Sequence, residues 1–239
     1  MKRAFAAGVV AAAALSLAAC SLDGHAISSP SGAAEMSDDV YPPSVDGPTS
    51  TTPASGDSTA FRLTGAPAGS TPKVVITVVE DMACPACKMF EERFGATLDD
   101  LSRSTDVAVD YHVISFLDRM SSDDYSSRAA NASFCAWHAS PGPTGKWRAF
   151  QRQMFDDQAP EGGAGLPDSE LASIARTTLN TDITSCITSR QYSSAVKSAT
   201  SSITDENWFQ GTPTVRINDR DFTPSTPDAL RAAVTAAAR

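Results

Sequence analysis

Cys84 and Cys87, separated by two residues, are the pair with the clearest chemistry in this sequence. They closely follow a β-branched run at residues 74–79 and begin a segment with helical periodicity. At the start of a helix, unpaired N–H groups and the positive end of the dipole favour an anion, so we expect a lowered pKa for the Cys84 thiol. A thiolate attacks disulfides, and Cys87, one turn further along, can close a disulfide with Cys84. The spacing predicts a site of thiol–disulfide exchange.

The elements around this pair predict an α/β fold. Residues 74–79 do not alternate, which is typical of a central strand covered on both faces, and residues 107–116 predict a second strand. Because a strand, a helix and a strand follow one another, we expect a βαβ unit and a partly parallel sheet. The intervening helix has an apolar stripe, and Gly95 is expected to kink it. The stripe consists of Phe90, Phe94, Leu98 and Leu101.

The rest of the folded part is predicted to be mostly helical at first and then to return to the sheet. Residues 121–202 have helical patterning, with Pro/Gly-rich breaks at residues 140–145 and 159–167. Residues 214–217 predict a third strand and residues around 221–223 a fourth. A Thr-Pro-Asp sequence at residues 226–228 is a start signal for the last helix.

Two motifs resemble the thioredoxin superfamily and, within it, the DsbA-like thiol:disulfide oxidoreductases of bacterial envelopes. They are residues 81–90, with the sequence Asp-Met-Ala-Cys-Pro-Ala-Cys-Lys-Met-Phe, and residues 211–215, Gly-Thr-Pro-Thr-Val, which look like the family's cis-proline loop. The resemblance covers residues 73–239. It implies a thioredoxin-like α/β fold with a helical domain inserted at about residues 121–202.

The resemblance also implies roles for single residues. Cys84 becomes the nucleophile and Cys87 the resolving and later leaving thiol, in a redox-active disulfide that needs no further cofactor and no metal. Pro213, expected in the cis form, packs against the pair, and the Thr212 backbone pairs with an extended substrate chain. Pro85 supports the site by fixing φ at the start of the helix.

The sequence departs from the family at two positions near the cysteines. Many members carry an acidic residue six positions before the first cysteine, where this chain has Val78; Glu80 and Asp81 are the nearby acids, and the sequence does not decide between them as a buried proton acceptor. Ala86 offers no charge or hydrogen bond to the Cys84 thiolate, unlike the histidine of strongly oxidising relatives. We therefore expect a less oxidising pair.

Cys135 and Cys186 most simply form a structural disulfide, because the other two cysteines of the folded part are assigned to the active site. Similar second disulfides occur in actinobacterial DsbA-like proteins, and the Ala-, Ser- and Asp-rich composition fits that source. One alternative is two free buried thiols. Another is a zinc site that combines Cys135 and His138 with the Cys84 pair, although the gap between the two halves far exceeds a zinc-ribbon spacing.

The N-terminus predicts export and anchoring. Residues 1–19 have a positive start and an apolar run and are predicted to be a signal peptide. They end in Leu-Ala-Ala before Cys20, which looks like a bacterial lipobox with Cys20 as the lipidated residue; an ordinary cleavage site is the alternative. Residues 20–72 are predicted to be a disordered acidic tether, because 29 of residues 21–72 are Ser, Thr, Pro or Gly. Phe61 and Leu63 hint that its end packs on the domain at residues 73–239.

Composition excludes several classes of protein. A formal net charge of −9, from 19 basic and 28 acidic residues, excludes a basic nucleic-acid footprint. Beyond the N-terminus, no apolar run is long enough to span a membrane. We thus expect a protein on the outer face of the cell membrane, held by a lipid anchor, in a compartment that permits disulfides.

Three functions remain open at this stage. The leading hypothesis is an enzyme that donates its disulfide to reduced, unfolded exported proteins and is reoxidised by a membrane quinone-linked oxidase. The second is a reductase or isomerase on the same fold, although the sequence has no separate dimerisation module and we expect a monomer. The third is a non-catalytic lipoprotein that binds copper or serves as a docking domain.

Overall fold

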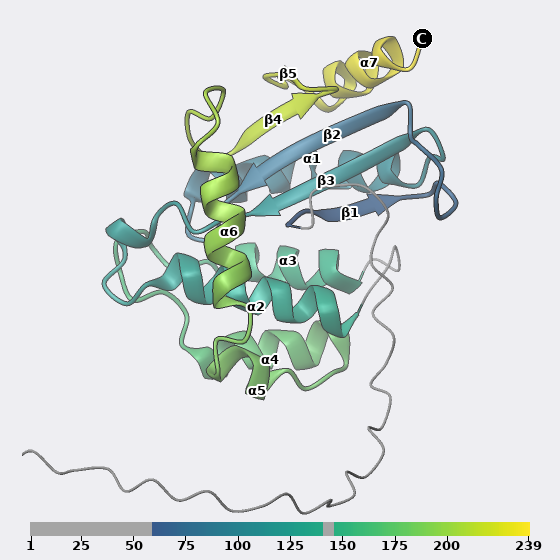
Figure 1. Ribbon diagram of the computed structural model, residues 1–239. Helices are drawn as coiled ribbons and strands as arrows, with labels where there is room; N and C mark the ends of the chain where they lie inside the picture. Colours follow the sequence, from purple (N-terminus) through teal and green to yellow (C-terminus); the bar gives the residue numbers. More distant parts are fainter. Residues whose placement is uncertain (1–58, 141–145) are drawn as a thin grey trace, which may run out of the picture. The chain divides into compact units, whose positions relative to one another are not determined.

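A five-stranded mixed sheet organises the molecule (Figure 1). In the computed structural model, which describes residues 59–140 and 146–239, the strands lie in the order β1-β3-β2-β4-β5. β2 and β3 are parallel, and the other neighbouring strands are antiparallel. The strands are β1 (Phe61–Thr64), β2 (Val74–Glu80), β3 (Val107–Val113), β4 (Thr214–Ile217) and β5 (Arg220–Asp221).

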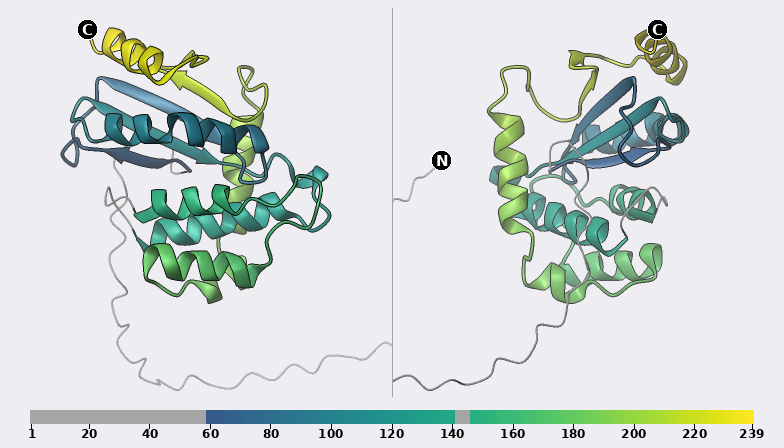
Figure 2. Two further views of the ribbon diagram at one scale, coloured as in Figure 1. Left: turned by 180° about the vertical axis from the view of Figure 1, so that it is seen from behind. Right: turned by 45° about the vertical axis from the view of Figure 1, so that its right-hand side comes forward.

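Helices cover both faces of this sheet. Helix α1 (Pro85–Ser102) and helix α7 (Pro227–Ala237) lie on one face, and helix α6 (Ser193–Thr204) lies on the other (Figure 2). Covering on both faces explains why β2 is rich in valine and why every residue of β3 is buried, Asp110 and His112 included. The predicted βαβ unit is confirmed. The second strand ends earlier than predicted, because the chain turns at Ser115 towards α6 and its N–H donates to Thr200 Oγ1.

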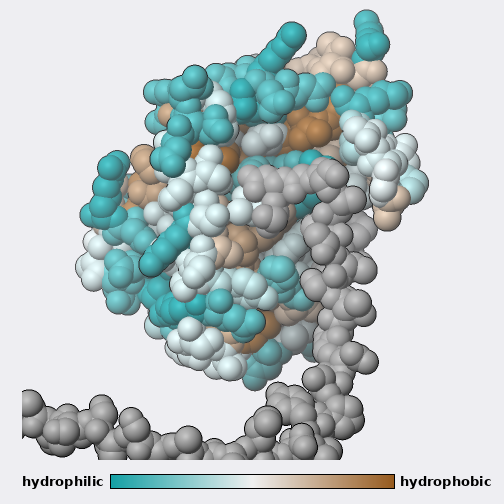
Figure 3. All heavy atoms as spheres, viewed as in Figure 1, coloured by the Kyte–Doolittle hydropathy of each residue, from teal (hydrophilic) through white to brown (hydrophobic). Residues whose placement is uncertain are grey.

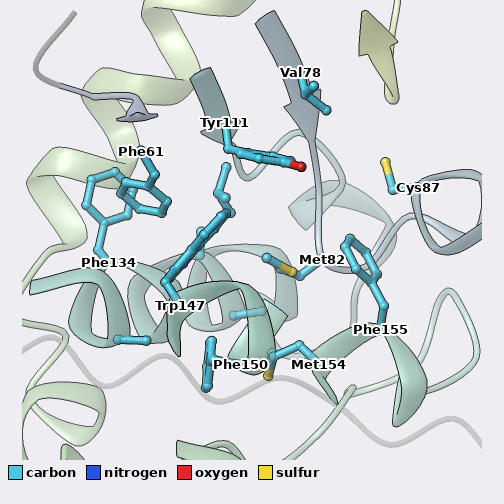
Figure 4. Packing of buried hydrophobic residues seen from close by; sticks show 14 of the residues in the cluster. Phe61, Val78, Met82, Cys87, Tyr111, Phe134, Trp147, Phe150, Met154 and Phe155 are labelled. Carbon is cyan, nitrogen blue, oxygen red and sulfur yellow. The ribbon is translucent and has the colours of Figure 1, made fainter. Parts of the chain in front are cut away.

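The predicted helical insertion is present between β3 and β4 and lies at the β1 edge of the sheet (Figure 1). Phe61 of β1 joins the two parts, because its ring packs against Phe134 and Trp147 of the insertion (Figure 4). No helix in the described part of the chain is long and apolar enough to cross a membrane. The remaining elements of the insertion are the 3-10 turn η1 (Asp118–Met120), α2 (Tyr125–Ala139), α3 (Lys146–Asp156), α4 (Asp168–Leu179) and α5 (Thr184–Thr188).

The predicted boundary of the folded domain at residue 73 is wrong, because the sheet already includes β1. Residues 20–72 were expected to be a disordered tether, yet Phe61 pairs with Tyr111 and Leu63 with Val109. Phe61 and Leu63 are buried and alternate with partly exposed residues, which is the pattern of an edge strand with one apolar face. Residues 1–58, with the predicted signal peptide, Cys20 and most of the tether, lie outside the described residues.

A disulfide joins Cys135 in α2 to Cys186 in α5, with 6.0 Å between the two Cα atoms. The pairing agrees with the prediction. It also means that Cys135 is not available as a thiolate ligand for the zinc site considered as an alternative. Next to the bond, Asn131 accepts a hydrogen bond from the Tyr192 N–H at 2.9 Å, which ties α2 to the start of α6.

Helix α1 runs unbroken through Gly95, from Pro85 to Ser102. Gly95 allows a close approach: a Cβ atom at this position would lie 2.6 Å from Glu91 Oε2 and 3.1 Å from Arg148 Nη2. Arg148 is thereby able to reach from α3 across the surface of α1. Glycine at residue 95 is required by packing and not by backbone conformation.

We predict that Gly95→Ala lowers the free energy of unfolding by about 1–3 kcal/mol, because the Cβ displaces a buried ion pair. Helix propensity by itself would make the alanine variant about 1 kcal/mol more stable. The sign of the change therefore distinguishes the packing role of Gly95 from an effect of helix propensity. Urea unfolding of the wild-type and variant proteins measures it. Ala96→Gly, at an exposed neighbouring position of α1, is the control and reports helix propensity alone. A stabilised Gly95→Ala variant would contradict the packing role.

Candidate active site

Cys84 lies at the junction between the loop after β2 and the start of α1. It is the N-cap residue of the helix, and Pro85 occupies the first turn, as expected from its fixed φ. The loop is held from inside by Asp81, whose backbone carbonyl accepts from the Cys84 N–H at 3.0 Å. This arrangement points the first N–H groups of α1 at the region of the Cys84 sulfur.

The Cys84 thiolate is stabilised by several donors. The Cys87 thiol is the strongest influence, followed by the Thr212 side chain and the backbone N–H groups of Cys87 and Ala86. These hydrogen bonds outweigh the opposing effect of burial and lower the pKa of Cys84 to about 6. At neutral pH the sulfur is therefore mostly ionised, which is the reactive form.

The second motif, residues 211–215, lies next to the Cys84 sulfur of the first motif. The peptide bond between Thr212 and Pro213 is cis, and Cys84 Sγ lies 3.3 Å from the Thr212 carbonyl oxygen. The sheet brings them together, because Thr214 of β4 pairs with Val79 of β2. Residues 128 positions apart in the chain thus form one site. The cis bond expected before Pro213 is present, and Thr212 lies beside Cys84.

Cys87 has the opposite environment from Cys84. Its side chain is fully buried at the end of the core that contains Val78, Met82 and Phe155 (Figure 4). Burial raises the pKa of its thiol well above the ordinary value, and the neighbouring Cys84 sulfur and the charge of Glu80 raise it further. The two cysteines therefore differ: one sulfur is an anion and the other holds its proton.

Glu80 and Asp81, the two acids that the sequence offers as a buried proton acceptor, lie in different environments. The carboxylate of Asp81 accepts three hydrogen bonds, from the N–H groups of Ala83 and Leu117 at 2.9 Å each and from Ser126 Oγ at 2.6 Å. Burial outweighs these bonds and raises the pKa of Asp81 to about 6. Asp81 therefore anchors the active-site loop, whereas the charge of Glu80 acts on the Cys87 thiol.

An open groove of about 470 Å³ borders Cys84. Cys84 itself is only 6% exposed, so its sulfur is approached through this groove. Met89, on the rim, is 62% exposed, which is unusual for a large apolar side chain. On the face seen in Figure 3, by comparison, hydrophobic residues of the described part appear as separate areas among hydrophilic ones. The groove is lined by Cys84, Pro85, Ala86, Met89, Phe116, Leu117, Glu161, Gly211 and Thr212.

Sequence reasoning missed several residues at this site. Gln158, just after α3, donates to the carbonyl oxygens of Met82 and Cys84 at 2.9 and 3.1 Å and so holds the active-site loop from the side of the insertion. Phe116 lines the groove and packs edge-to-face against Phe209. Only the apolar end of the predicted second strand pointed to Phe116, and no local pattern pointed to Gln158.

Comparison with known proteins is consistent with this geometry. A family model described as "Thioredoxin" matches residues 64–236. The oxidised DsbA of Mycobacterium tuberculosis is 34% identical, with a TM-score of 0.64 over 75% of this chain and 92% of that chain. The reduced disulfide bond oxidoreductase DsbG of the same organism is also 34% identical, with a TM-score of 0.66 over 76% and 88%. BdbD from Bacillus subtilis, at 20% identity and a TM-score of 0.62, shares the fold.

A further match is to part of a much longer protein. The serine/threonine-protein kinase PknE of Mycobacterium tuberculosis is 33% identical over 106 residues, which are 43% of this chain and 18% of the kinase. The similarity thus spans less than a fifth of that relative. Together with the site geometry, the family match and the full-domain similarities show that the chain belongs to the thioredoxin family, as a DsbA-type thiol-disulfide oxidoreductase.

We predict that reduced protein reacts with iodoacetamide at a single site, Cys84, with a rate that rises through a midpoint near pH 6. The pKa of about 6 for Cys84 and the raised pKa of Cys87 are the reason. Because the pKa of Cys84 is depressed, ionisation of its thiol stabilises the reduced folded state. This contribution is complete above the pKa of an unfolded cysteine and is lost as the pH falls through about 6. Mass spectrometry of the quenched reaction measures rate and site. A midpoint above pH 8 would contradict the assigned stabilisation.

Proposed function

We propose that this protein donates the Cys84–Cys87 disulfide to reduced proteins outside the cytoplasm. The observation that carries the proposal is the stabilised Cys84 anion. A thiolate that is stable in the reduced enzyme makes the reduced form favourable, and the disulfide is then readily given away. The M. tuberculosis relatives bear the names DsbA and DsbG, and the latter is described as a disulfide bond oxidoreductase, which supports the chemistry.

The exchange proceeds at the sulfur of Cys84. A substrate thiolate enters the groove and attacks Cys84 Sγ, and the Cys84–Cys87 bond breaks with its electron pair on Cys87 Sγ. The buried Cys87 sulfur takes a proton, because its pKa is raised. A second substrate thiolate then attacks the substrate sulfur of the mixed disulfide, which releases oxidised substrate and leaves Cys84 as the stabilised thiolate.

The groove and the cis-proline loop provide a place for the substrate chain. The backbone of Thr212 lies beside Cys84 and can pair with an extended peptide, and Pro213 has no N–H that would compete for the sulfur. Met89 and Phe116 offer flexible and aromatic apolar contact, which fits unfolded chains of varied sequence. Cysteine-containing segments of different substrate proteins would bind in this same way.

The proposed location follows from the sequence. The lipobox ending at Cys20 supports a lipid anchor on the outer face of the membrane, and residues 21–58 would hold the domain away from it. The Cys135–Cys186 disulfide fits an oxidising compartment. A membrane quinone-linked oxidase is the proposed reoxidant for the reduced Cys84 pair.

We predict that the oxidised protein restores activity to reduced, unfolded ribonuclease, and that Cys84→Ser abolishes this while retaining the fold. The reason is that the Cys84 sulfur receives the attacking thiolate. Ribonuclease activity over time measures the transfer, and Ser102→Ala, at the far end of α1, is the control. No gain over buffer, together with efficient insulin reduction and isolation of the protein in the reduced state, would support a reductase instead.

We predict that Ala86→His makes the disulfide more oxidising, because an added imidazole can donate to the Cys84 thiolate and further favour the reduced form. Equilibration with glutathione buffers measures the change as at least a severalfold shift in the equilibrium constant. Ala86→Leu adds bulk without a donor and is the matched control. An equal shift in both variants would show that Ala86 does not limit the oxidising power.

A further inference from the structure

The Pro/Gly-rich break between α3 and α4 contributes one residue to the groove beside Cys84. This residue is Glu161, whose side chain is exposed. Of the residues that line the groove, all within the described part of the chain, Glu161 is the only one with an acidic or basic side chain apart from the cysteine itself. When Cys84 is in the disulfide, a single charge therefore borders an otherwise uncharged groove.

The chain is anchored on both sides of Glu161. Three residues earlier, Gln158 Nε2 donates to the carbonyl oxygen of Cys84 at 3.1 Å. Two residues later, the carbonyl oxygen of Gly163 accepts from the N–H of Ser122 at 3.2 Å. The backbone at residue 161 is thus held between the active-site loop and the segment before α2.

The remainder of this loop is fixed by α2. The buried guanidinium of Arg128 donates to the carbonyl oxygen of Leu166 at 2.8 Å. Gly165, with a φ of +66°, packs against Tyr125, and a Cβ atom at residue 165 would lie 2.0 Å from the tyrosine ring. Because the loop is held at these points, Glu161 needs little further ordering of the backbone to meet a ligand.

No side chain of the described residues pairs with the Glu161 carboxylate, which forms no ion pair and accepts no hydrogen bond there. Two basic residues on elements that border the groove have other contacts. The guanidinium of Arg119 lies over the Phe116 ring, 5.0 Å from its centroid. Lys88 Nζ donates to the carbonyl oxygen of Asp156 at 3.1 Å. Glu161 is therefore available to a positive charge brought by a ligand.

An apolar lining with one carboxylate complements the side chains of lysine and arginine. Both have an aliphatic stem that covers apolar surface and a charged head that pairs with a carboxylate. Phe116 and Leu117 provide apolar surface in the same groove as Glu161. An acidic side chain would be repelled by Glu161 and would gain no pairing. The groove thus fits a cationic segment of chain better than an anionic one.

We propose that Glu161 selects substrate segments that carry lysine or arginine beside the reacting cysteine and disfavours acidic ones. The inference rests on the proposed function, because it names the class of substrate that the groove accepts. Glu161 determines specificity and takes no part in the exchange of sulfur bonds. The substrate thiolate still attacks Cys84 Sγ, and the electron pair of the broken bond still goes to Cys87 Sγ.

Peptide thiols that differ only in charge test the selection. The oxidised protein is mixed with an excess of a short peptide whose single cysteine is flanked on both sides by lysine, by glutamine or by glutamate. Acid quenching, alkylation and mass spectrometry measure the rate at which the Cys84–Cys87 disulfide opens. In wild type, we expect the lysine peptide to react fastest and the glutamate peptide slowest.

Variants separate the charge of Glu161 from the reactivity of the peptides, since a neighbouring lysine also lowers the pKa of a cysteine thiol. Glu161→Gln should reduce the ratio of the lysine-peptide rate to the glutamate-peptide rate by about two- to fivefold, the scale of an exposed ion pair. The reactivities of the peptides themselves cancel when this ratio is compared between proteins. Glu161→Lys should reduce the ratio further.

Glu92→Gln is the matched control. Glu92 is an exposed glutamate of α1 that does not line the groove, so its replacement removes the same charge elsewhere and should leave the rate ratio unchanged. High salt provides a second readout, because it screens exposed charges. The wild-type ratio should fall towards that of Glu161→Gln as salt is added.

The outcomes separate this inference from the proposed function. If wild type reacts with all three peptides and the rate ratio is the same in Glu161→Gln and Glu161→Lys, the selection is wrong while the disulfide exchange stands. If the ratio falls equally in Glu92→Gln, the net charge of the protein and not the groove attracts cationic substrates. If folded wild-type protein reacts with none of the peptides, the proposed function fails, and the selection fails with it.

Discussion

The chemistry of the site depends on the stabilisation of one anion, the Cys84 sulfur, where three segments of chain meet. The loop after β2 presents the sulfur, the first turn of α1 supplies N–H donors, and the Thr212 segment closes the third side. This meeting requires the register between β2 and β4 in which Val79 faces Thr214. A slip by one residue would turn the side chains of β4 to the opposite face and move Thr212 away from the sulfur. The strand pairing is therefore a condition of the chemistry.

A second constraint is the burial of charge on the inner side of the same helix. Ionised groups in a core are expensive, and proteins keep them when they are paired or when they serve a reaction. Asp81 belongs to the first kind, because donors from the loop and from α2 surround its carboxylate. Glu80 differs, since one of its oxygens has no donor and its charge acts on Cys87. Two adjacent acids on one strand end thus have separate roles.

The sequence was informative where a short segment alone determines the local structure. The valine-rich strands, the Cys84 pair with Pro85, and the Thr-Pro start of α7 depend on local geometry, and all were predicted from it. Contacts that need the completed fold could not be found in this way. Gln158 reaches the active-site loop only after α3 has docked, and the reason for Gly95 is an arginine 53 positions away. Phe61 and Leu63 indicated that the end of the tether packs on the domain, but the strand β1 was not predicted, because its four residues lie in a Ser/Thr/Pro/Gly-rich stretch.

The opposite environments of the two cysteines also explain why the helical insertion packs where it does. Cys84 must remain accessible to a substrate, and it borders an open groove on whose rim Met89 is exposed. Cys87 must be kept from water, because a solvated second thiol would have an ordinary pKa and would compete as a nucleophile. Phe155 of α3 belongs to the same core as Cys87, and Arg148, on the same helix, pairs with Glu91 and opposes the effect of burial on Glu80. One helix of the insertion therefore both excludes water from the resolving cysteine and compensates the charge of the acids next to it, which a thioredoxin core without the insertion would have to achieve with other residues.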